Sequence, residues 1–291
     1  MSDRSRPIVA ALWMLGAVVS FTTMAVAGRE IGGVHTTFEI LLFRSLVGIL
    51  IVSVIGAALG RLNEVRTKRL GLHGVRNVCH FTAQNLWFYA LTVLPLANVL
   101  ALEFTTPLWI ALLSPLFLGE RMTRARVFAA GLGFLGILII VRPGTVAIGP
   151  GVLAGAASAI FFAGTYMATK GLARSETTLS ILFWLTVIQA GLGAVTVAAF
   201  GSVTWPTWGT LPYLLLIAVC GLAGHFFITN ALHHAPTSVV APFDFLRLPL
   251  AAVVGLILYD EPLVATFILG AALVLSANAV NIRAEQARAR V

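Results

Sequence analysis

The chain has 291 residues, of which 59% are hydrophobic and only 10% are charged, and its mean hydropathy is +0.96. This composition excludes an ordinary soluble domain. In lipid each backbone polar group must be satisfied internally, and the alternation typical of membrane strands is absent, so we predict an all-helical integral membrane protein. The net charge of +8 comes from short basic segments between apolar runs. That distribution indicates membrane topology and excludes nucleic acid as a partner.

The apolar runs are taken in chain order, since a transmembrane helix needs about 20 apolar residues. Runs of this kind lie at about 8–26, 38–59, 72–93, 97–118, 125–141, 150–170, 178–200, 210–232, 237–258 and 263–282. The first run is followed by no small-residue cleavage pattern, so we interpret it as a true span and not a signal peptide. The sequence therefore predicts ten transmembrane helices.

The basic residues between these runs predict the orientation in the membrane. Of the 19 Lys and Arg residues, fourteen fall on the side that holds both termini, whereas only Arg29 and Arg142 fall on the other. The remaining three, Arg44, Arg76 and Arg247, lie inside spans. Because basic loops stay in the cytoplasm, we predict a multi-pass protein of the prokaryotic inner membrane with both termini cytoplasmic.

The second half of the chain repeats the first at an offset of 141 residues. The offset aligns Cys79 with Cys220, Pro95 with Pro236, Glu103 with Asp244, Phe104 with Phe245 and Glu120 with Glu261, without a gap. We interpret the halves, 1–145 and 146–291, as two related five-helix repeats. An odd number of spans per repeat inverts the second copy, which is the architecture of many secondary transporters that work by alternating access.

Several motifs resemble those of a known superfamily. They are Leu41-Leu42-Phe43-Arg44, Pro107 followed by Leu118-Gly119-Glu120-Arg121, and Val141-Arg142-Pro143-Gly144 with its echo Asp260-Glu261-Pro262. The chain resembles the drug/metabolite transporter superfamily, and within it the ten-span EamA-type exporters. The resemblance implies a bundle around a central cavity lined mainly by spans 1, 3, 4, 6, 8 and 9. It also implies export of amino acids or related metabolites, with the aromatic amino-acid exporters as the nearest group.

Three ionisable residues fall inside the predicted spans 4 and 9: Glu103, Asp244 and Arg247. A charge at the centre of a lipid-facing helix costs about 2.5 to 3.5 kcal/mol on insertion scales, so we expect these side chains to face the interior. Asp244 and Arg247 have the i, i+3 spacing that allows them to neutralise each other or to share a zwitterionic ligand. Glu103 either carries a proton in an exchange cycle or bonds a hydroxyl on a neighbouring helix.

Polar stripes on the predicted spans 3 and 8 supply further candidates. Asn77, His80, Gln84 and Trp87 recur at helical spacing on the third span, and His225, Thr229 and His233 do so on the eighth. Such stripes share one helix face. Facing each other they would form the wall of an aqueous cavity; the alternative is interhelical hydrogen bonding, worth about 0.6 kcal/mol per pair.

Spans 1 and 6 combine aromatic rings with hydroxyl groups, a combination that suits an amphipathic organic ligand. The candidates there are Trp13, Ser20 and Tyr166. Trp13 is equally well explained as an interfacial anchor. Arg44 is expected to have a structural role, either reaching the interface or pairing with Glu39, and contact with a ligand is the alternative.

Acidic residues that precede helices 5 and 10, Glu120 and the Asp260-Glu261-Pro262 group, are interpreted as structural caps. An ATP-driven pump is excluded because no GxxxxGK[ST] loop is present. Neither an HExxH pair nor a paired-aspartate site is found, so we expect no enzyme, metal or cofactor. The predicted partners are a small-molecule substrate, the lipid bilayer and, as one candidate, a coupling proton. A channel or scaffold remains the alternative class, and a monomer and a homodimer both remain open.

Overall fold

The computed structural model describes residues 7–118, 124–141, 149–173, 175–200, 203–234 and 243–289, and all regular structure in these ranges is helical. In the first half the elements are α1 (Pro7–Ile31), α2 (Thr37–Ala58), the 3-10 turn η1 (Leu62–Val65), α3 (Leu70–Val93), α4 (Leu96–Glu103), α5 (Thr106–Leu118) and α6 (Arg124–Val141). In the second half they are α7 (Pro150–Leu172), α8 (Thr178–Phe200), α9 (Leu211–His234), α11 (Arg247–Tyr259) and α12 (Ala265–Ala289). The prediction of an all-helical fold is confirmed for these residues.

Seven segments in the described ranges are long and apolar enough to cross a membrane. They are Ile8–Ile31, Thr37–Ala58, Leu96–Leu113, Pro150–Leu172, Thr178–Phe200, Leu211–Ala231 and Ala265–Ala284. The predicted third span, α3, is not among them, because its buried face carries charged and amide side chains that lower its mean hydropathy. The total of ten spans therefore stays a prediction.

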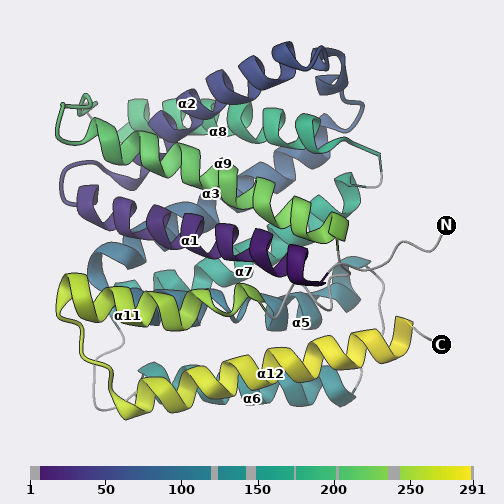
Figure 1. Ribbon diagram of the computed structural model, residues 1–291, viewed down its shortest axis with the longest axis vertical. Coiled ribbons are helices and arrows are strands. Elements are labelled where there is room, and N and C mark those ends of the chain that lie inside the picture. Colours follow the sequence, from purple (N-terminus) through teal and green to yellow (C-terminus); the bar gives the residue numbers. More distant parts are fainter. Residues whose placement is uncertain are drawn as a thin grey trace.

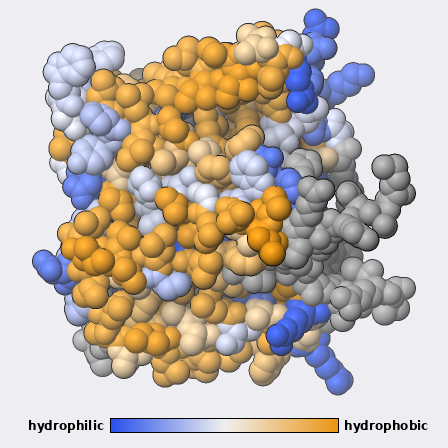
Figure 2. All heavy atoms as spheres, viewed as in Figure 1, coloured by the Kyte–Doolittle hydropathy of each residue, from blue (hydrophilic) through white to orange (hydrophobic). Residues whose placement is uncertain are grey.

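The outer surface of the bundle is apolar. Large side chains such as Leu50, Phe117 and Phe200 are mostly exposed. Apolar residues cover most of the face shown in Figure 2, and the most hydrophilic residues gather at its left and right edges. An exposed apolar belt between two polar rims is the surface expected of a protein that has lipid as its solvent.

Helices of the first half pack mainly against helices of the second half. α1 packs against α9, and in the same way α7 packs against α3. α2 pairs with α8, and α6 pairs with α12, which lies directly over it in Figure 1. The pairing is reciprocal: the first helix of each half contacts the third helix of the other.

The predicted spans 97–118 and 237–258 are not continuous helices. The first is broken at Phe104–Thr105, between α4 and α5, and the second at Phe245–Leu246, before α11. Leu96–Leu113 is still among the candidate membrane spans despite its break, and residues 237–242 lie outside the described residues. The two breaks are separated by the repeat offset, and the rings of Phe104 and Phe245 meet edge to face with centroids 5.4 Å apart.

The chemistry of the first break explains why it is stable inside the bundle. Pro107 has no N–H to donate to the carbonyl of Glu103, and the Thr106 hydroxyl donates to that oxygen instead, at 2.6 Å. The Phe104 carbonyl accepts a bond of 2.7 Å from Asn278 Nδ2 on α12. Non-helical backbone is tolerated at membrane depth where such partners replace the lost helical bonds.

Close packing of α6 on α12 depends on glycine. A Cβ atom at Gly136 would lie 2.7 Å from the carbonyl oxygen of Gly270, and one at Gly270 would lie 2.6 Å from the carbonyl oxygen of Gly136. Backbones can approach this closely only where neither residue has a side chain. This contact brings the last helices of the two halves together.

Candidate functional site

An acidic triad, defined as Glu103, Asp244 and Arg247, lies at the two helix breaks: Glu103 and Asp244 directly precede them, and Arg247 directly follows the second. Arg247 donates from Nε and Nη2 to the two carboxylate oxygens of Asp244, both at 2.9 Å. It also donates from Nη1 to Glu103 Oε1 at 3.1 Å. The contact of Asp244 with Arg247 follows the predicted spacing, and Glu103 joins the pair from the other half of the chain.

Aromatic side chains enclose the triad. Trp87 of α3 donates from its indole nitrogen to Glu103 Oε2 at 2.9 Å. The guanidinium carbon of Arg247 lies 5.2 Å from the ring centroid of Phe21 on α1 and 5.0 Å from that of Phe104. Cation–π contacts at these distances hold the guanidinium while leaving its charge available.

The triad combines a negative balance of charge with partial access to solvent. Two carboxylates face one guanidinium, and the three side chains are between 10% and 25% exposed. Tyr166 of α7 lies within electrostatic range of all three, although 58% of its surface is exposed. It is one helical turn from Phe162, whose ring contacts His80, so the two side chains share one face of α7.

A second group, the guanidinium cluster, is defined as Arg44, Arg76, His80 and Gln84. Arg44 of α2 donates from Nη1 to Gln84 Oε1 at 2.5 Å. Arg76 of α3 donates from Nε to Thr169 Oγ1 on α7 at 2.8 Å. Both guanidinium groups are buried, and no carboxylate in the described ranges forms an ion pair with either of them.

Neither expected role of Arg44 is observed. The side chain is too deeply buried to reach the interface, and Glu39 is engaged elsewhere. Glu39 closes a capping box with Thr36 at the start of α2 and accepts a bond from the Thr204 amide. Arg44 instead fits against α9 at Gly221, where a Cβ atom would lie 2.9 Å from its Nη2.

One histidine, His80, belongs to the guanidinium cluster, and another, His225 of α9, lies near it. His80 is buried, and neither of its ring nitrogens has a hydrogen-bond partner in the part of the chain that the structure describes. Its ring meets the edge of Phe162 at 5.8 Å, and that of His225 meets Phe21 at 5.5 Å. Both imidazoles are within electrostatic range of Arg44 and of Arg76 on the preceding turn of α3.

Two predicted site residues, Trp13 and Ser20, lie on α1. Trp13 packs against Phe226 and Phe227 of α9, with ring centroids 5.9 and 5.8 Å away. Ser20 is buried next to Phe21. On α9 Thr229 donates to the carbonyl of its own helix at His225, and the side chain of His233 lies outside the described residues.

The two polar stripes therefore divide between different partners. Gln84 accepts a bond from Arg44 and Trp87 donates one to Glu103, while His80 is within electrostatic range of Arg44 and Arg76. Sequence reasoning missed Arg76 as a site residue, although it precedes His80 by one helical turn on the same face. It also missed Phe21 and Phe104, because apolar rings in apolar helices give no signal of their own.

At the end of the bundle where α1 finishes, Glu261 joins the halves. It forms an ion pair with Arg29 and accepts a 2.9 Å bond from the Leu96 amide at the start of α4. Tyr259 donates to Glu30 at 2.8 Å. The prediction that Glu261 caps the tenth helix was wrong, since it caps α4 instead; Glu120 lies outside the described residues.

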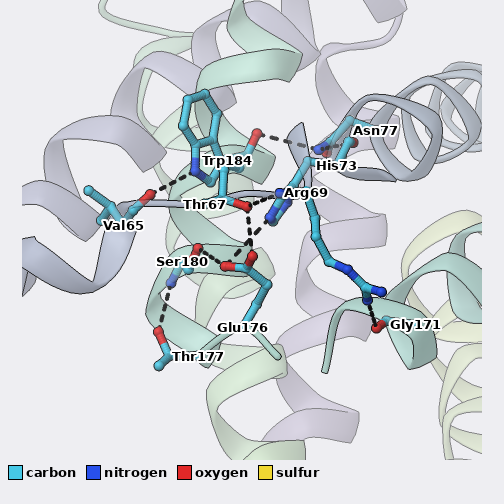
Figure 3. A network of polar contacts seen from close by, with 10 residues as sticks. All are labelled: Val65, Thr67, Arg69, His73, Asn77, Gly171, Glu176, Thr177, Ser180 and Trp184. Atoms are coloured by element: carbon cyan, nitrogen blue, oxygen red, sulfur yellow. Dashed lines mark hydrogen bonds and ion pairs between the residues drawn. The ribbon is translucent and has the colours of Figure 1, made fainter. Parts of the chain in front are cut away.

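The opposite end is joined by a network around Glu176, in the loop between α7 and α8 (Figure 3). Glu176 accepts bonds from the hydroxyl groups of Thr67 at 2.6 Å and Ser180 at 2.8 Å. The Thr67 bond, with help from that of Ser180, lowers the pKa of Glu176 below its ordinary value, while partial burial opposes the shift. Arg69 donates to the Gly171 carbonyl at 2.8 Å and adds a second tie between the halves.

Comparison with solved structures supports the fold. One protein crystal structure matches 93% of this chain and 95% of its own chain, with a TM-score of 0.64 and 22% sequence identity. At this identity the likeness concerns the fold alone.

Comparison with curated proteins identifies transporters. A riboflavin transporter of Rhizobium johnstonii is 31% identical over 99% of this chain and 95% of its own length. The pseudopaline exporter CntI of Pseudomonas aeruginosa is 30% identical over 91% of this chain and 93% of its own. An S-adenosylmethionine uptake transporter of Rickettsia felis is 25% identical over 94% of this chain and 92% of its own. These relatives confirm a multi-pass membrane transporter and not an enzyme.

The family comparison matches the chain twice. The model of the EamA-like transporter family covers residues 8–142 and again residues 149–283. Two successive matches confirm that one domain is repeated, and together they cover nearly the whole sequence. The chain therefore belongs to the EamA-like transporter family.

Proposed function

We propose that the protein is a secondary carrier that exports a small polar metabolite across a bacterial inner membrane by alternating access. The observation that supports this most strongly is the acidic triad. It lies at two helix breaks that are one repeat apart, and Arg247 of the second half holds a carboxylate from each half. Broken helices that meet between repeats are the usual setting of a carrier site.

The arrangement of the halves supports an inverted repeat with boundaries at 1–145 and 146–291. Reciprocal pairing of α1 with α9 and of α7 with α3 is the pattern that a two-fold axis in the membrane plane would produce. The start of α1 and the end of α12 lie on the same side in Figure 1. With fourteen of 19 basic residues on that side, we place both ends in the cytoplasm.

The polar networks at the two ends would open in turn. The Glu261 network joins the halves at the outer end, and the Glu176 network joins them at the cytoplasmic end. Breaking one while keeping the other exposes the interior to one side at a time. Hydrogen bonds and ion pairs near a surface are weak enough individually to exchange in this way.

The cargo class is a ring-bearing polar metabolite, with aromatic amino acids as the first candidates. Carboxylates and a guanidinium surrounded by Phe21, Phe104 and Trp87 match a zwitterion attached to a ring. A flat neutral ring of the riboflavin type is the second candidate, supported by the relative that is 31% identical over 99% of the chain. The excess carboxylate of the triad makes a proton the coupling ion in this proposal.

Purified protein in liposomes tests the proposal. Labelled aromatic amino acids, riboflavin and S-adenosylmethionine are assayed with and without a pH gradient. We expect saturable flux of at least one of them, faster with the gradient, and equal flux for the control Arg61→Gln, which changes an exposed loop residue paired only with Glu64. Absence of protein-dependent flux across the panel would overturn the cargo class, and flux that never saturates would favour a channel.

A further inference from the structure

The guanidinium cluster lacks the partners that buried charges normally have. Arg44 and Arg76 are only 8% and 5% exposed. Their bonds go to the neutral oxygens of Gln84, Thr169 and Asn77. Buried charges in membrane proteins are usually paired, because an uncompensated charge is costly. Two such cations at neighbouring positions indicate that the compensating anion comes from outside the described protein groups.

Neutral donors around the two cations are also left unused. In either protonation state an imidazole carries at least one N–H, and neither nitrogen of the buried His80 ring is bonded. Gln84 accepts from Arg44 through its oxygen, so its amide nitrogen remains a donor directed away from that bond. The site is therefore rich in donors and poor in acceptors.

Helix geometry places these donors around one position. Arg76, His80 and Gln84 follow each other at intervals of four residues on α3, so successive side chains are about 6 Å apart along one face. Gln84 holds the Arg44 guanidinium at the far end of this row, and His80 is within electrostatic range of both arginines. An anion beside His80 would be reached from both sides by forked guanidinium donors.

We propose that Arg44, Arg76, His80 and Gln84 form a subsite for the anionic group of the cargo, a carboxylate or a phosphate. This inference rests on the proposed function and narrows its cargo class. Guanidinium forks match both oxyanions through paired hydrogen bonds. Because no carboxylate of the described chain occupies the cluster, the cluster is available to an oxyanion on the ligand.

The subsite lies next to the acidic triad. Gln84 of the cluster and Trp87, which holds Glu103, are three residues apart on α3, a rise of about 4.5 Å. A zwitterionic ligand would place its cationic end at Glu103 and Asp244 and its anionic end at Arg44 and Arg76. The acidic triad and the guanidinium cluster would then bind opposite ends of one ligand.

Binding to the purified full-length protein in detergent tests the subsite without any transport step. The probes are matched pairs, riboflavin 5′-phosphate against riboflavin and phenylalanine against phenylalaninamide, together with inorganic phosphate alone. We expect the acidic member of at least one pair to bind about tenfold more tightly or better and to raise the melting temperature more. Phosphate that stabilises the protein without competing with the organic acids would indicate a free-anion site and overturn the cargo assignment.

Variants separate binding from folding. Arg76→Gln and Arg44→Gln should each abolish the preference for the acidic member, whereas Arg44→Lys should keep part of it and the surface control Arg61→Gln all of it. The ligand-free melting temperature of Arg76→Gln should not fall, since the variant removes an uncompensated charge. A preference that survives in both glutamine variants, or equal binding of both members of every pair, would overturn the subsite.

The outcome also distinguishes the subsite from the proposed function. Charge-dependent binding that needs Arg44 and Arg76, combined with no flux in liposomes, would keep the subsite and overturn the carrier. Saturable flux with no preference for acidic cargo would keep the carrier and overturn the subsite.

Discussion

The two charged groups inside the bundle differ in how their charges are balanced. In the acidic triad Arg247 is bonded to both carboxylates, and its guanidinium also contacts the rings of Phe21 and Phe104. Within the described residues, Arg44 and Arg76 of the guanidinium cluster bond only neutral groups, and the ring nitrogens of His80 have no hydrogen-bond partner. Both groups contact the same face of α3, the triad through Trp87 and the cluster through its own residues Arg76, His80 and Gln84.

This contrast teaches that charge inside one membrane protein can serve two purposes. A bonded triad that joins both halves contributes to holding them together, although burying its charges still costs solvation energy. An unpaired guanidinium contributes less of this kind, as in the bond of Arg76 to the Thr169 hydroxyl of the other half, and its charge is costly until an anion arrives. The two groups should therefore respond in opposite ways when a charge is removed.

The largest effect is expected from Arg247→Gln. The change leaves Glu103 and Asp244 close together without their cation, and removing one partner of a buried ion pair costs about 3 to 5 kcal/mol. Partial exposure of the triad places the expected loss near the lower limit. Thermal unfolding in detergent measures it, with Arg247→Lys as the control that keeps the charge. A variant as stable as the wild type would contradict the role given to the triad.

A large effect on transport, with a small one on folding, is expected from Asp244→Asn. The variant keeps the size of the side chain and leaves Glu103 to neutralise Arg247, so the protein should insert and fold normally. Transport should slow by about tenfold or more, which corresponds to about 1.4 kcal/mol. Initial rates in liposomes at matched protein content measure this. Normal flux would leave Asp244 with a purely structural role.

In the guanidinium cluster, Arg76→Met should not lower the stability, in contrast to Arg247→Gln in the acidic triad. The variant loses the bond to Thr169 but removes an uncompensated buried charge. We expect the ligand-free protein to be as stable as the wild type or more stable by about 1 kcal/mol, since replacing buried charges by apolar groups is often neutral or stabilising. Unfolding experiments on the two proteins without ligand provide the comparison. A marked loss of stability would show that Arg76 supports the fold.

The smallest effect concerns a carboxylate outside the membrane, Glu176. Its pKa is lowered in the folded state, chiefly by the Thr67 hydroxyl, so its contribution to stability is present above its ordinary value of 4.5 and disappears as the pH falls through the folded value. At neutral pH we expect Glu176→Gln to cost about 1 kcal/mol or less. The melting temperatures of the wild type and of Glu176→Gln should converge as the pH falls from 7 to below the pKa of Glu176. A constant difference across the range would contradict the assignment.

Local spacing predicted some of this site, and tertiary packing decided the rest. The i, i+3 spacing of Asp244 and Arg247 was sufficient to predict their contact, which the structure confirms. The approach of Glu103 to the same arginine, 144 residues away, depends on how the halves pack, and spacing cannot report it. The break at Phe104–Thr105 was missed because hydropathy stays high through it, although Pro107 marks where a helical bond is lost.

The predictions that failed were mainly those that assigned a charged side chain to a partner nearby in the sequence. Arg44 was expected to meet Glu39 on its own helix, but Glu39 is held by the cap of α2 and by the Thr204 amide. Glu261 was assigned to the nearest helix start in sequence, whereas the helix start that it caps in space belongs to α4. In both cases the correct partner comes from a different part of the chain, so only the packed structure reveals it.

Accessibility of Tyr166 from the two faces of the membrane tests the central claim, alternating access to one interior site, most directly. Tyr166→Cys is made with Cys79 and Cys220 replaced by serine, and a membrane-impermeant thiol reagent is applied to each face. Carrier behaviour predicts labelling from both faces. A disulfide between Thr67→Cys and Glu176→Cys would lock the cytoplasmic end, since the native side chains at these positions are hydrogen-bonded at 2.6 Å. Carrier behaviour predicts that this disulfide abolishes labelling from the cytoplasmic face alone. Labelling that the cross-link leaves unchanged on both faces would contradict the account.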